Sequence, residues 1–253
     1  MIKAVLFDMG GTLEDIFVDD SSHRTAVTRV GEMLRAFGLD PKVEDDAELM
    51  ARVDAGWKRY GVYRDKTNVE CKPISIWCDY VLSDFGFPRE QLEPHCEELA
   101  HMWEITHYHR VLRPRVAEML DGLRAMGLKL GIISNTAALY QVFDSLEEYG
   151  IRGYFQDVTL SSVTGLRKPL PDIFYVSTHQ LRVQPDECVY VGDTMSRDII
   201  GSKRAGFACS IQIGSQLTKE KDQGVHSEFV PDHFITDIYD VYPILRDLLC
   251  KGM

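Results

Sequence analysis

From about Pro114 onward, short apolar runs typical of buried strands alternate with segments of helical periodicity. The expected strands span 128–134, 155–161, 188–192, 207–213 and 233–236, and the expected helices span 115–126, 138–149, 171–181, 197–205 and 239–249. Strands that alternate with helices form βαβ units, in which the strands are parallel and helices cover both faces of the sheet. This pattern predicts an α/β fold with a doubly wound, Rossmann-like parallel sheet.

The region between the first apolar run and Pro114 has a different texture. A buried strand is expected at Val5–Phe7, but residues 16 to 112 contain helical patterns and almost no β-branched runs. Helices are expected at 25–37, 47–60, 73–85 and 89–107. We therefore expect a core domain built from residues 1–15 and 113–253. A helical-bundle cap domain, residues 16–112, would be inserted after the first strand.

Two charged segments are expected to be exposed loops. Residues 61–67 would join two cap helices, and their Arg64 and Lys66 are candidates to contact an anionic substrate. Residues 215–230 are rich in Lys, Glu, Asp and Gly, which predicts a solvated loop.

Composition disfavours several classes of function. No apolar run approaches the ~18–20 residues of a membrane span. The four apolar residues that follow Lys3 are too few for a secretory signal. The net charge of −11 disfavours binding to nucleic acid or to an anionic membrane surface. The six cysteines lack metal-site spacing and are expected to be reduced packing residues. We expect a cytoplasmic monomer or homodimer that acts on a small molecule.

Polar residues follow three of the expected strands at the point where each strand ends. They are Asp8, Ser134–Asn135 and Asp193, with Asp198 and Lys168 in nearby loops. In an open parallel sheet, ligands bind beyond the carboxyl ends of the strands. Three clustered carboxylates repel one another unless a cation lies among them. Carboxylates are the ligands that Mg²⁺ takes in proteins, so the cluster predicts a Mg²⁺ site.

Each of these signals also has an ordinary structural interpretation. A lone aspartate after a strand more often caps a turn than acts as a nucleophile, and Ser134–Asn135 before a helix is a typical N-cap. A lysine before a proline, such as Lys168, is commonly a surface loop residue. The joint occurrence of these residues at strand ends favours a catalytic site over the separate interpretations.

Four stretches of the chain resemble the signature motifs of the haloacid dehalogenase superfamily, a family of hydrolases with an aspartate nucleophile. The stretches are Asp8-Met9-Gly10-Gly11-Thr12-Leu13, Gly131-Ile132-Ile133-Ser134-Asn135, Gly165-Leu166-Arg167-Lys168-Pro169, and Val189-Tyr190-Val191-Gly192-Asp193 with Asp198. The resemblance covers the whole chain, because the helical block lies where one branch of the family carries a helical cap. Together these motifs are specific for the family and unspecific for a substrate.

The resemblance implies the catalytic roles. Asp8 would be the nucleophile that forms a covalent aspartyl intermediate. Lys168 would neutralise developing negative charge and keep Asp8 ionised, Ser134 would contact the transferring group, and Thr12 would orient the loop.

The resemblance also implies which groups bind the ion and the substrate. The metal ligands would be Asp8, the carbonyl oxygen of Gly10, Asp193 and Asp198, the last either as a ligand or as an outer-shell partner. The oxygens of the transferring group would be held by Ser134, Lys168 and the N–H groups of Gly11 and Asn135.

Gly10 is the departure from the family pattern. Phosphatases of the family carry an aspartate there, which protonates the leaving oxygen and later activates water. General acid–base catalysis of this kind contributes ~10²–10⁴ in rate. The substitution leaves three explanations: a slow phosphatase that favours good leaving groups, another group in place of the acid, or a reaction that needs no acid.

The chain offers candidates for the second and third explanations. The substitutes for the acid would be Glu14 or Asp15 on the next loop, or one of the cap histidines His23, His101, His107 and His109. Family members that cleave carbon–phosphorus bonds have a small residue at this position and use a cap lysine, for which Lys42, Lys58, Lys66 and Lys72 are available. Dehalogenases of the family usually have a tyrosine there and need no metal, and the pair Asp193 and Asp198 speaks against that branch.

The leading hypothesis is a Mg²⁺-dependent phosphatase with an aspartate nucleophile, acting on a small phosphorylated metabolite and weakened by Gly10. The alternatives are a phosphonatase-like or other non-phosphatase hydrolase of the superfamily, or a catalytically weak protein that binds a phosphorylated ligand.

Overall fold

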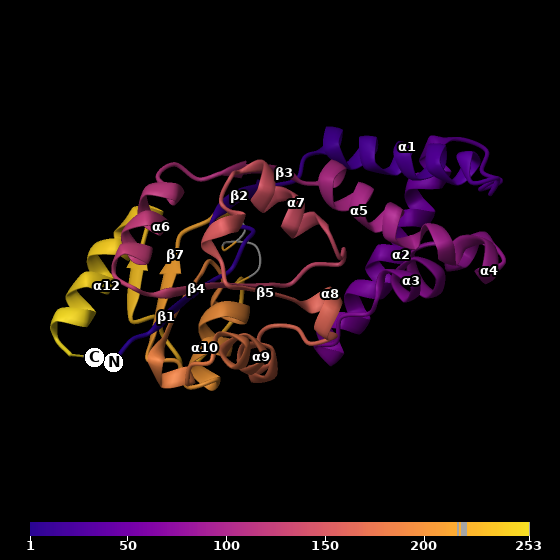
Figure 1. The fold of residues 1–253 in the computed structure, drawn as a ribbon. Coiled ribbons are helices and arrows are strands. Elements are labelled where there is room, and N and C mark those ends of the chain that lie inside the picture. Colours follow the sequence, from indigo (N-terminus) through magenta and orange to yellow (C-terminus); the bar gives the residue numbers. More distant parts are fainter. Residues whose placement is uncertain (217, 219–221, 253) are drawn as a thin grey trace.

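The computed structural model describes residues 1–253 except for 217, 219–221 and 253. Its centre is a sheet of six parallel strands in the order β5-β4-β1-β6-β7-β8 (Figure 1). The strands are β1 (Ala4–Phe7), β4 (Lys129–Ser134), β5 (Asp157–Leu160), β6 (Cys188–Gly192), β7 (Cys209–Ile213) and β8 (His233–Ile235). This arrangement confirms the predicted doubly wound parallel sheet.

Helices cover both faces of the sheet, because alternate residues of each strand face opposite sides. Val5 and Phe7 pack into one apolar core, whereas Ala4 and Leu6 pack into another. The first core includes residues of α6 (Val116–Ala125), α7 (Gln141–Glu148) and α12 (Val241–Cys250). The second includes residues of α9 (Pro171–Leu181) and is closed by α10 (Ile200–Arg204). The shorter elements of the core are η4 (Arg152–Tyr154), α8 (Ser161–Thr164), η5 (Pro185–Glu187), η6 (Met195–Ile199) and η7 (Ile238–Asp240).

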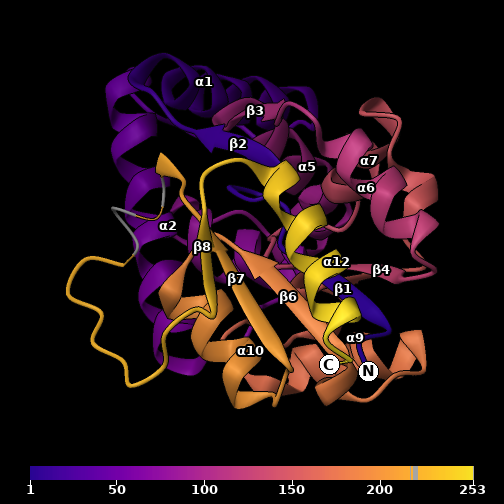
Figure 2. The same cartoon turned by 90° about the vertical axis from the view of Figure 1, so that its left-hand side faces the viewer.

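A helical cap lies over the carboxyl ends of the strands, at the far end of the molecule from both termini (Figures 1 and 2). Its elements are α1 (Asp20–Ala36), α2 (Asp46–Thr67), α3 (Pro73–Ser75), the π-helical η1 (Ile76–Val81), η2 (Ser83–Phe85), α4 (Arg89–Leu92), η3 (Glu93–His95) and α5 (Cys96–His107). They enclose a separate apolar core that includes Val53, Trp77 and Trp103. No helix among the described residues is long and apolar enough to cross a membrane.

The cap and its connections to the core differ from the sequence predictions in four places. Residues 61–67 are not a loop, because α2 continues to Thr67. The segment 73–85 divides into α3, η1 and η2, and the segment 89–107 is interrupted by η3, where Pro94 lacks the N–H that a continuous helix needs. Two short antiparallel strands, β2 (Glu14–Phe17) and β3 (His109–Leu112), were not predicted.

The cap also contacts the core directly. Val69, just after α2, forms an isolated antiparallel bridge with Leu166 of the core. The carboxylate of Glu70 pairs with Arg167 and accepts a hydrogen bond of 2.8 Å from the hydroxyl of Ser161. The Glu70 side chain is fully buried. The cap is therefore joined to the core loop that precedes Lys168 by a buried ion pair.

Candidate active site

The polar residues at three strand ends meet at one edge of the sheet. Asp8 follows β1, Ser134 ends β4, and Asp193 follows β6. These are three adjacent strands of the sheet, so their carboxyl ends lie side by side. All three residues line a cavity of about 610 Å³ between the sheet and the cap. The predicted convergence at the sheet edge is observed.

The ammonium of Lys168 lies between two carboxylates. Its Nζ is 2.7 Å from Asp8 Oδ1 and 2.7 Å from Asp198 Oδ1, and all three side chains are buried. Burial lowers the pKa of Lys168, but the two carboxylates outweigh this effect and hold it above its ordinary value. Burial raises the pKa of Asp8, and the attraction of Lys168 opposes the rise. Lys168 is therefore a fixed positive charge at the Asp8 carboxylate.

Tyr190 and Thr194 hold Asp198 in place, and neither residue was assigned a role from the sequence. The hydroxyl of Tyr190 lies 3.0 Å from Lys168 Nζ and donates to Asp198 Oδ1 over 3.1 Å. Asp198 Oδ2 accepts bonds from the backbone N–H and the hydroxyl of Thr194, at 2.9 and 2.6 Å. Although burial raises the pKa of Asp198, Lys168 and these bonds lower it below the usual range.

Asp193 is fixed by residues far along the chain. The hydroxyl of Ser215 donates to Asp193 Oδ2 at 2.6 Å, and that of Thr218 donates to its backbone carbonyl at 2.8 Å. Asp222 accepts bonds from the N–H groups of Met195 and Ser196. Ser215, Thr218 and Asp222 therefore contact the site, and the prediction of a solvated loop at 215–230 is wrong for these three residues. Residues 217 and 219–221 of that segment lie outside the described residues.

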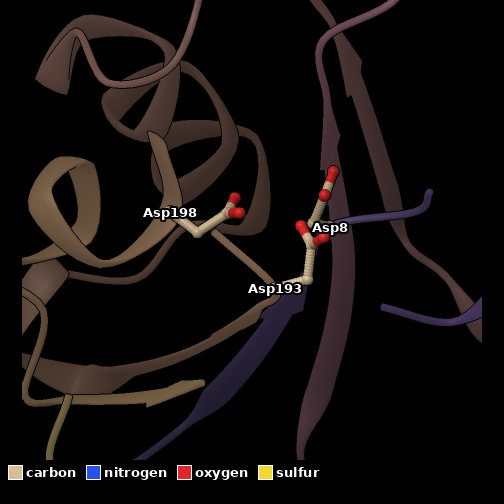
Figure 3. Close-up of side chains that lie close together, drawn as sticks. All are labelled: Asp8, Asp193 and Asp198. Atoms are coloured by element: carbon tan, nitrogen blue, oxygen red, sulfur yellow. The ribbon is translucent and has the colours of Figure 1, made fainter. Parts of the chain in front are cut away.

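The three carboxylates form one acidic cluster. Oxygen atoms of Asp8, Asp193 and Asp198 lie within 4.8 Å of one another, and Figure 3 shows their side chains converging. Lys168 neutralises one of the three negative charges, so the cluster retains a net negative charge. An all-oxygen donor set with excess negative charge has the chemistry that suits Mg²⁺.

The loop after Asp8 depends on Gly11. Its φ is +91°, and a Cβ atom there would lie 2.4 Å from Asp193 Oδ2. The N–H of Gly11 donates to the carbonyl of Glu14 at 2.8 Å, so it is engaged within the loop. Thr12 is fully buried, and neither residue belongs to the described residues that line the cavity.

Asn135 connects two of the motifs. Its Nδ2 donates to the carbonyl of Lys168 at 3.1 Å, and its Oδ1 accepts from the N–H of Lys168 at 3.0 Å. Both Ser134 and Asn135 line the cavity. The Asn135 side chain thus fixes the backbone that carries the Lys168 ammonium.

A guanidinium lies beside Gly10. A Cβ atom on Gly10 would be 3.7 Å from Arg110 Nη1 and 3.5 Å from Ile16 Cδ1, so the position has room for a side chain. Arg110 is paired with Glu14 through Nη1 and with Glu104 through Nη2, the latter at 2.7 Å. Nothing in the local sequence marks Arg110, because the pairing of β2 with β3 is what brings it opposite Ile16.

The structure shows which candidates for a substitute acid lie at the cavity and which are paired elsewhere. Glu14 is fully buried and bonded to Arg110 and to the hydroxyl of Tyr149, and Asp15 is exposed and paired with Arg113. His101 pairs with Asp144, and His109 pairs with Asp19. Only His23 and His107 of the six candidates are among the described lining residues.

The four cap lysines that were candidates for carbon–phosphorus cleavage can be compared with the residues that line the cavity. Among the described residues that line the cavity, the one lysine is Lys168. Lys42, Lys58, Lys66 and Lys72 are therefore not among the described residues that line the cavity.

Sequence comparisons show the family to which the chain belongs. A sequence model of the haloacid dehalogenase-like hydrolases matches residues 2–206. The chain is 29% identical over 251 residues to a glyceraldehyde 3-phosphate phosphatase of Methanopyrus kandleri, covering 98% of this chain and 99% of that protein. It is 30% identical to the human N-acylneuraminate-9-phosphatase, covering 99% and 96% of the two chains.

A structural comparison supports the same fold. The structure of a 2-haloacid dehalogenase from Pseudomonas syringae superposes with a TM-score of 0.66 at 20% identity, covering 98% of this chain and all of that one. The chain belongs to the haloacid dehalogenase-like hydrolases and is a hydrolase of that family. Both curated relatives named above are phosphatases.

Proposed function

We propose that this protein is a Mg²⁺-dependent phosphatase that acts on a small phosphorylated metabolite through a covalent intermediate on Asp8. The observation that carries the proposal is the buried Asp8–Lys168–Asp198 arrangement, with Asp193 beside it in the acidic cluster. The names of the full-length curated relatives support phosphate-ester hydrolysis over the other reactions of the family.

The acidic cluster has the donors that Mg²⁺ requires. Asp8, Asp193 and the carbonyl oxygen of Gly10 would hold the ion, and that carbonyl is retained whatever side chain position 10 carries. Because all of the oxygens of Asp198 are engaged by Lys168, Tyr190 and Thr194, we assign it an orienting role in the outer shell. When bound, Mg²⁺ supplies positive charge that neutralises the phosphoryl oxygens and the carboxylates.

In this proposal Asp8 attacks phosphorus and displaces the alcohol oxygen, giving an aspartyl phosphate that water then hydrolyses. Ser134 and the N–H of Asn135 would bind the phosphoryl oxygens, and Lys168 would neutralise negative charge during the transfer. Gly11 and Thr12 would act through the shape of the loop. Gly11 allows the close approach of Asp193, since a Cβ atom would collide with its carboxylate.

Arg110 would have a different role from the acid that is missing at position 10. Its Nη1 atom would lie 3.7 Å from a Cβ atom on residue 10. A guanidinium stabilises negative charge on the leaving oxygen but does not release a proton near neutral pH. The leaving alkoxide would then be protonated from solvent, so the rate should fall steeply as the leaving group becomes a stronger base.

The test is hydrolysis of an activated aryl phosphate by the wild type and by Asp8→Asn. We expect turnover that is removed by a chelator and restored by Mg²⁺, and a loss of at least ~10³-fold in the variant. Thermal melting of both proteins is the control for folding. Equal turnover in Asp8→Asn would overturn the assignment. Absence of turnover in both proteins, with stabilisation by phosphate, would favour the phosphate-binding alternative.

A further inference from the structure

Positive charge gathers in the cavity of an otherwise acidic protein. The net charge of the chain is −11. Among the described residues, the cavity is lined by one lysine and four arginines, which are Arg64, Arg110, Arg167, Lys168 and Arg197, and by four carboxylates, which are Asp8, Asp54, Glu104 and Asp193. Such a concentration needs either carboxylates within the protein or an anionic ligand to balance it.

Three of these five cations are balanced within the protein. Lys168 lies between two buried carboxylates, Arg110 is paired with Glu14 and Glu104, and Arg167 is paired with Glu70. These pairs hold the three side chains in place and give each of them a counter-charge within the protein. They account for Lys168, Arg110 and Arg167 without a ligand.

Arg64 and Arg197 lack such partners. In the described part of the chain, Arg64 forms an ion pair only with its neighbour Asp65, at 3.6 Å and with Asp65 71% exposed. The Nε atom of Arg64 is buried and has no hydrogen-bond acceptor among the described residues. The guanidinium of Arg197 forms no ion pair or hydrogen bond with any described residue. The pair of Arg64 with exposed Asp65 contributes little, because water screens such pairs.

The two arginines line the same cavity, one from the cap and one from the core. Arg64 lies in the last turn of the cap helix α2, and Arg197 lies in η6 of the core, between Asp193 and Asp198. Both repel the charge of Arg167, whose pKa is lowered first by burial and then by these two neighbours. Both also act on Tyr108, where with Arg110 they oppose the rise in pKa that burial and Glu104 cause. Both arginines line the cavity, and both act on the same two groups there, Arg167 and Tyr108.

We propose that Arg64 and Arg197 bind a second anionic group of the substrate, so that the substrates are phosphate monoesters that also carry a carboxylate or a second phosphate. This inference rests on the proposed phosphatase function. Guanidinium groups bind carboxylates and phosphates through paired N–H donors. A cavity of about 610 Å³ has room for such a molecule beyond its reacting phosphoryl group. Binding between the cap and the core would also hold the two together around the substrate.

The test compares matched substrates in the wild type, Arg64→Met and Arg197→Met. 3-Phosphoglycerate carries a carboxylate where glycerol 3-phosphate carries an alcohol, and fructose 1,6-bisphosphate carries a phosphate that fructose 6-phosphate lacks. We expect the wild type to prefer one charged member, and each variant to lose ~10–100-fold more kcat/KM on that member than on its uncharged counterpart. The preferred pair distinguishes a carboxylate from a second phosphate.

Lys66→Met is the matched control, because Lys66 lies on the same helix and is exposed. We expect it to keep the wild-type preference. A variant series in which charged and uncharged members lose equally, or in which the wild type has no preference, overturns the anionic subsite while leaving the phosphatase assignment intact.

Binding to Asp8→Asn separates the two proposals if no substrate is hydrolysed. Calorimetry with the same pairs of esters then measures affinity alone. Tighter binding of the charged member that is lost in Asp8→Asn/Arg64→Met supports the subsite despite failure of the proposed reaction, and equal binding of both members overturns it.

Discussion

The cavity contains two kinds of cation, and the contrast between them separates chemistry from recognition. Lys168 stands on a loop held by Asn135 and is bonded to Asp8 and Asp198. Arg64 and Arg197, in contrast, come from two different parts of the molecule and lack a buried counter-ion among the described residues. A charge that is paired in advance does not need to reorganise when the reaction occurs. A charge without a partner gains most when a ligand supplies one.

Among the cations that are paired with carboxylates, Lys168 is the one whose replacement should change stability and kcat most, so Lys168→Met has the largest predicted effect. It leaves the buried carboxylates of Asp8 and Asp198 without their cation, which costs about 3–5 kcal/mol of unfolding free energy. It should also reduce kcat by ~10²–10³-fold through lost charge stabilisation. Urea unfolding without added metal and steady-state kinetics measure the two losses.

Arg197→Met is the matched comparison for that variant. It removes a cation from the same cavity but leaves no buried carboxylate unpaired, so the unfolding free energy should change by less than about 0.5 kcal/mol. Comparable destabilisation by both substitutions would contradict the distinction between paired and unpaired cations.

Gly10→Asp tests how the leaving group is handled. The new carboxyl would stand close to Arg110, since a Cβ atom at Gly10 is 3.7 Å from Nη1. The guanidinium should lower the pKa of the new carboxyl and limit its use as an acid. We therefore expect a gain below the ~10²–10⁴-fold of general acid–base catalysis, and only for alkyl esters with poor leaving groups.

The control for this prediction is Gly10→Asn, which has the same shape but cannot donate a proton as an acid. Rates on a series of aryl and alkyl phosphates measure the dependence on the leaving group. If Gly10→Asp and Gly10→Asn accelerate every ester alike, proton transfer is not what position 10 limits.

The strand ends were the part of the molecule that the sequence could predict well. Asp8, Ser134 and Asp193 each follow a buried apolar run, so their positions depend on local pattern and on the rule that parallel strands end at a common edge. The family resemblance then assigned expected roles to them. The parallel sheet and the inserted helices followed from the same local patterns.

The residues that were not predicted are positioned by contacts between distant segments. Arg110 reaches Gly10 because β3 pairs with β2, and each of these strands has only four residues without a strong strand pattern. Ser215 contacts Asp193 from a charged segment that looks like an ordinary loop. Arg64 was identified as a candidate, but the segment that carries it was predicted to be a loop, whereas α2 continues through it to Thr67.

Glu70→Gln should weaken the contact between cap and core. The side chain keeps its hydrogen-bonding oxygen but loses the charge that balances buried Arg167. We expect unfolding in denaturant to become easier by about 1–3 kcal/mol. Glu48→Gln is the control, since Glu48 forms an exposed pair with Arg52 that should contribute less than ~0.5 kcal/mol. Equal effects of the two substitutions would show that the buried pair does not join the domains.

The smallest predicted effect is a dependence of stability on pH through His107. Burial and the neighbouring His23, whose Nδ1 is 3.3 Å from Nδ1 of His107, lower the pKa of His107 to about 4. Between pH 4 and about 6.5 the unfolded chain therefore binds a proton at His107 that the folded protein does not bind. This contribution to stability is present above pH 6.5 and is lost as the pH falls toward 4.

For a side chain that remains partly exposed, the loss should be about 1–2 kcal/mol. Unfolding of the wild type and of His107→Gln at pH 7 and at pH 4.5 measures it, and the variant should lose less stability on acidification. His226→Gln, at an exposed position, is the control and should behave like the wild type. If His107→Gln instead loses as much stability as the wild type, His107 is solvated in the folded protein and its ring is available to a ligand in the cavity.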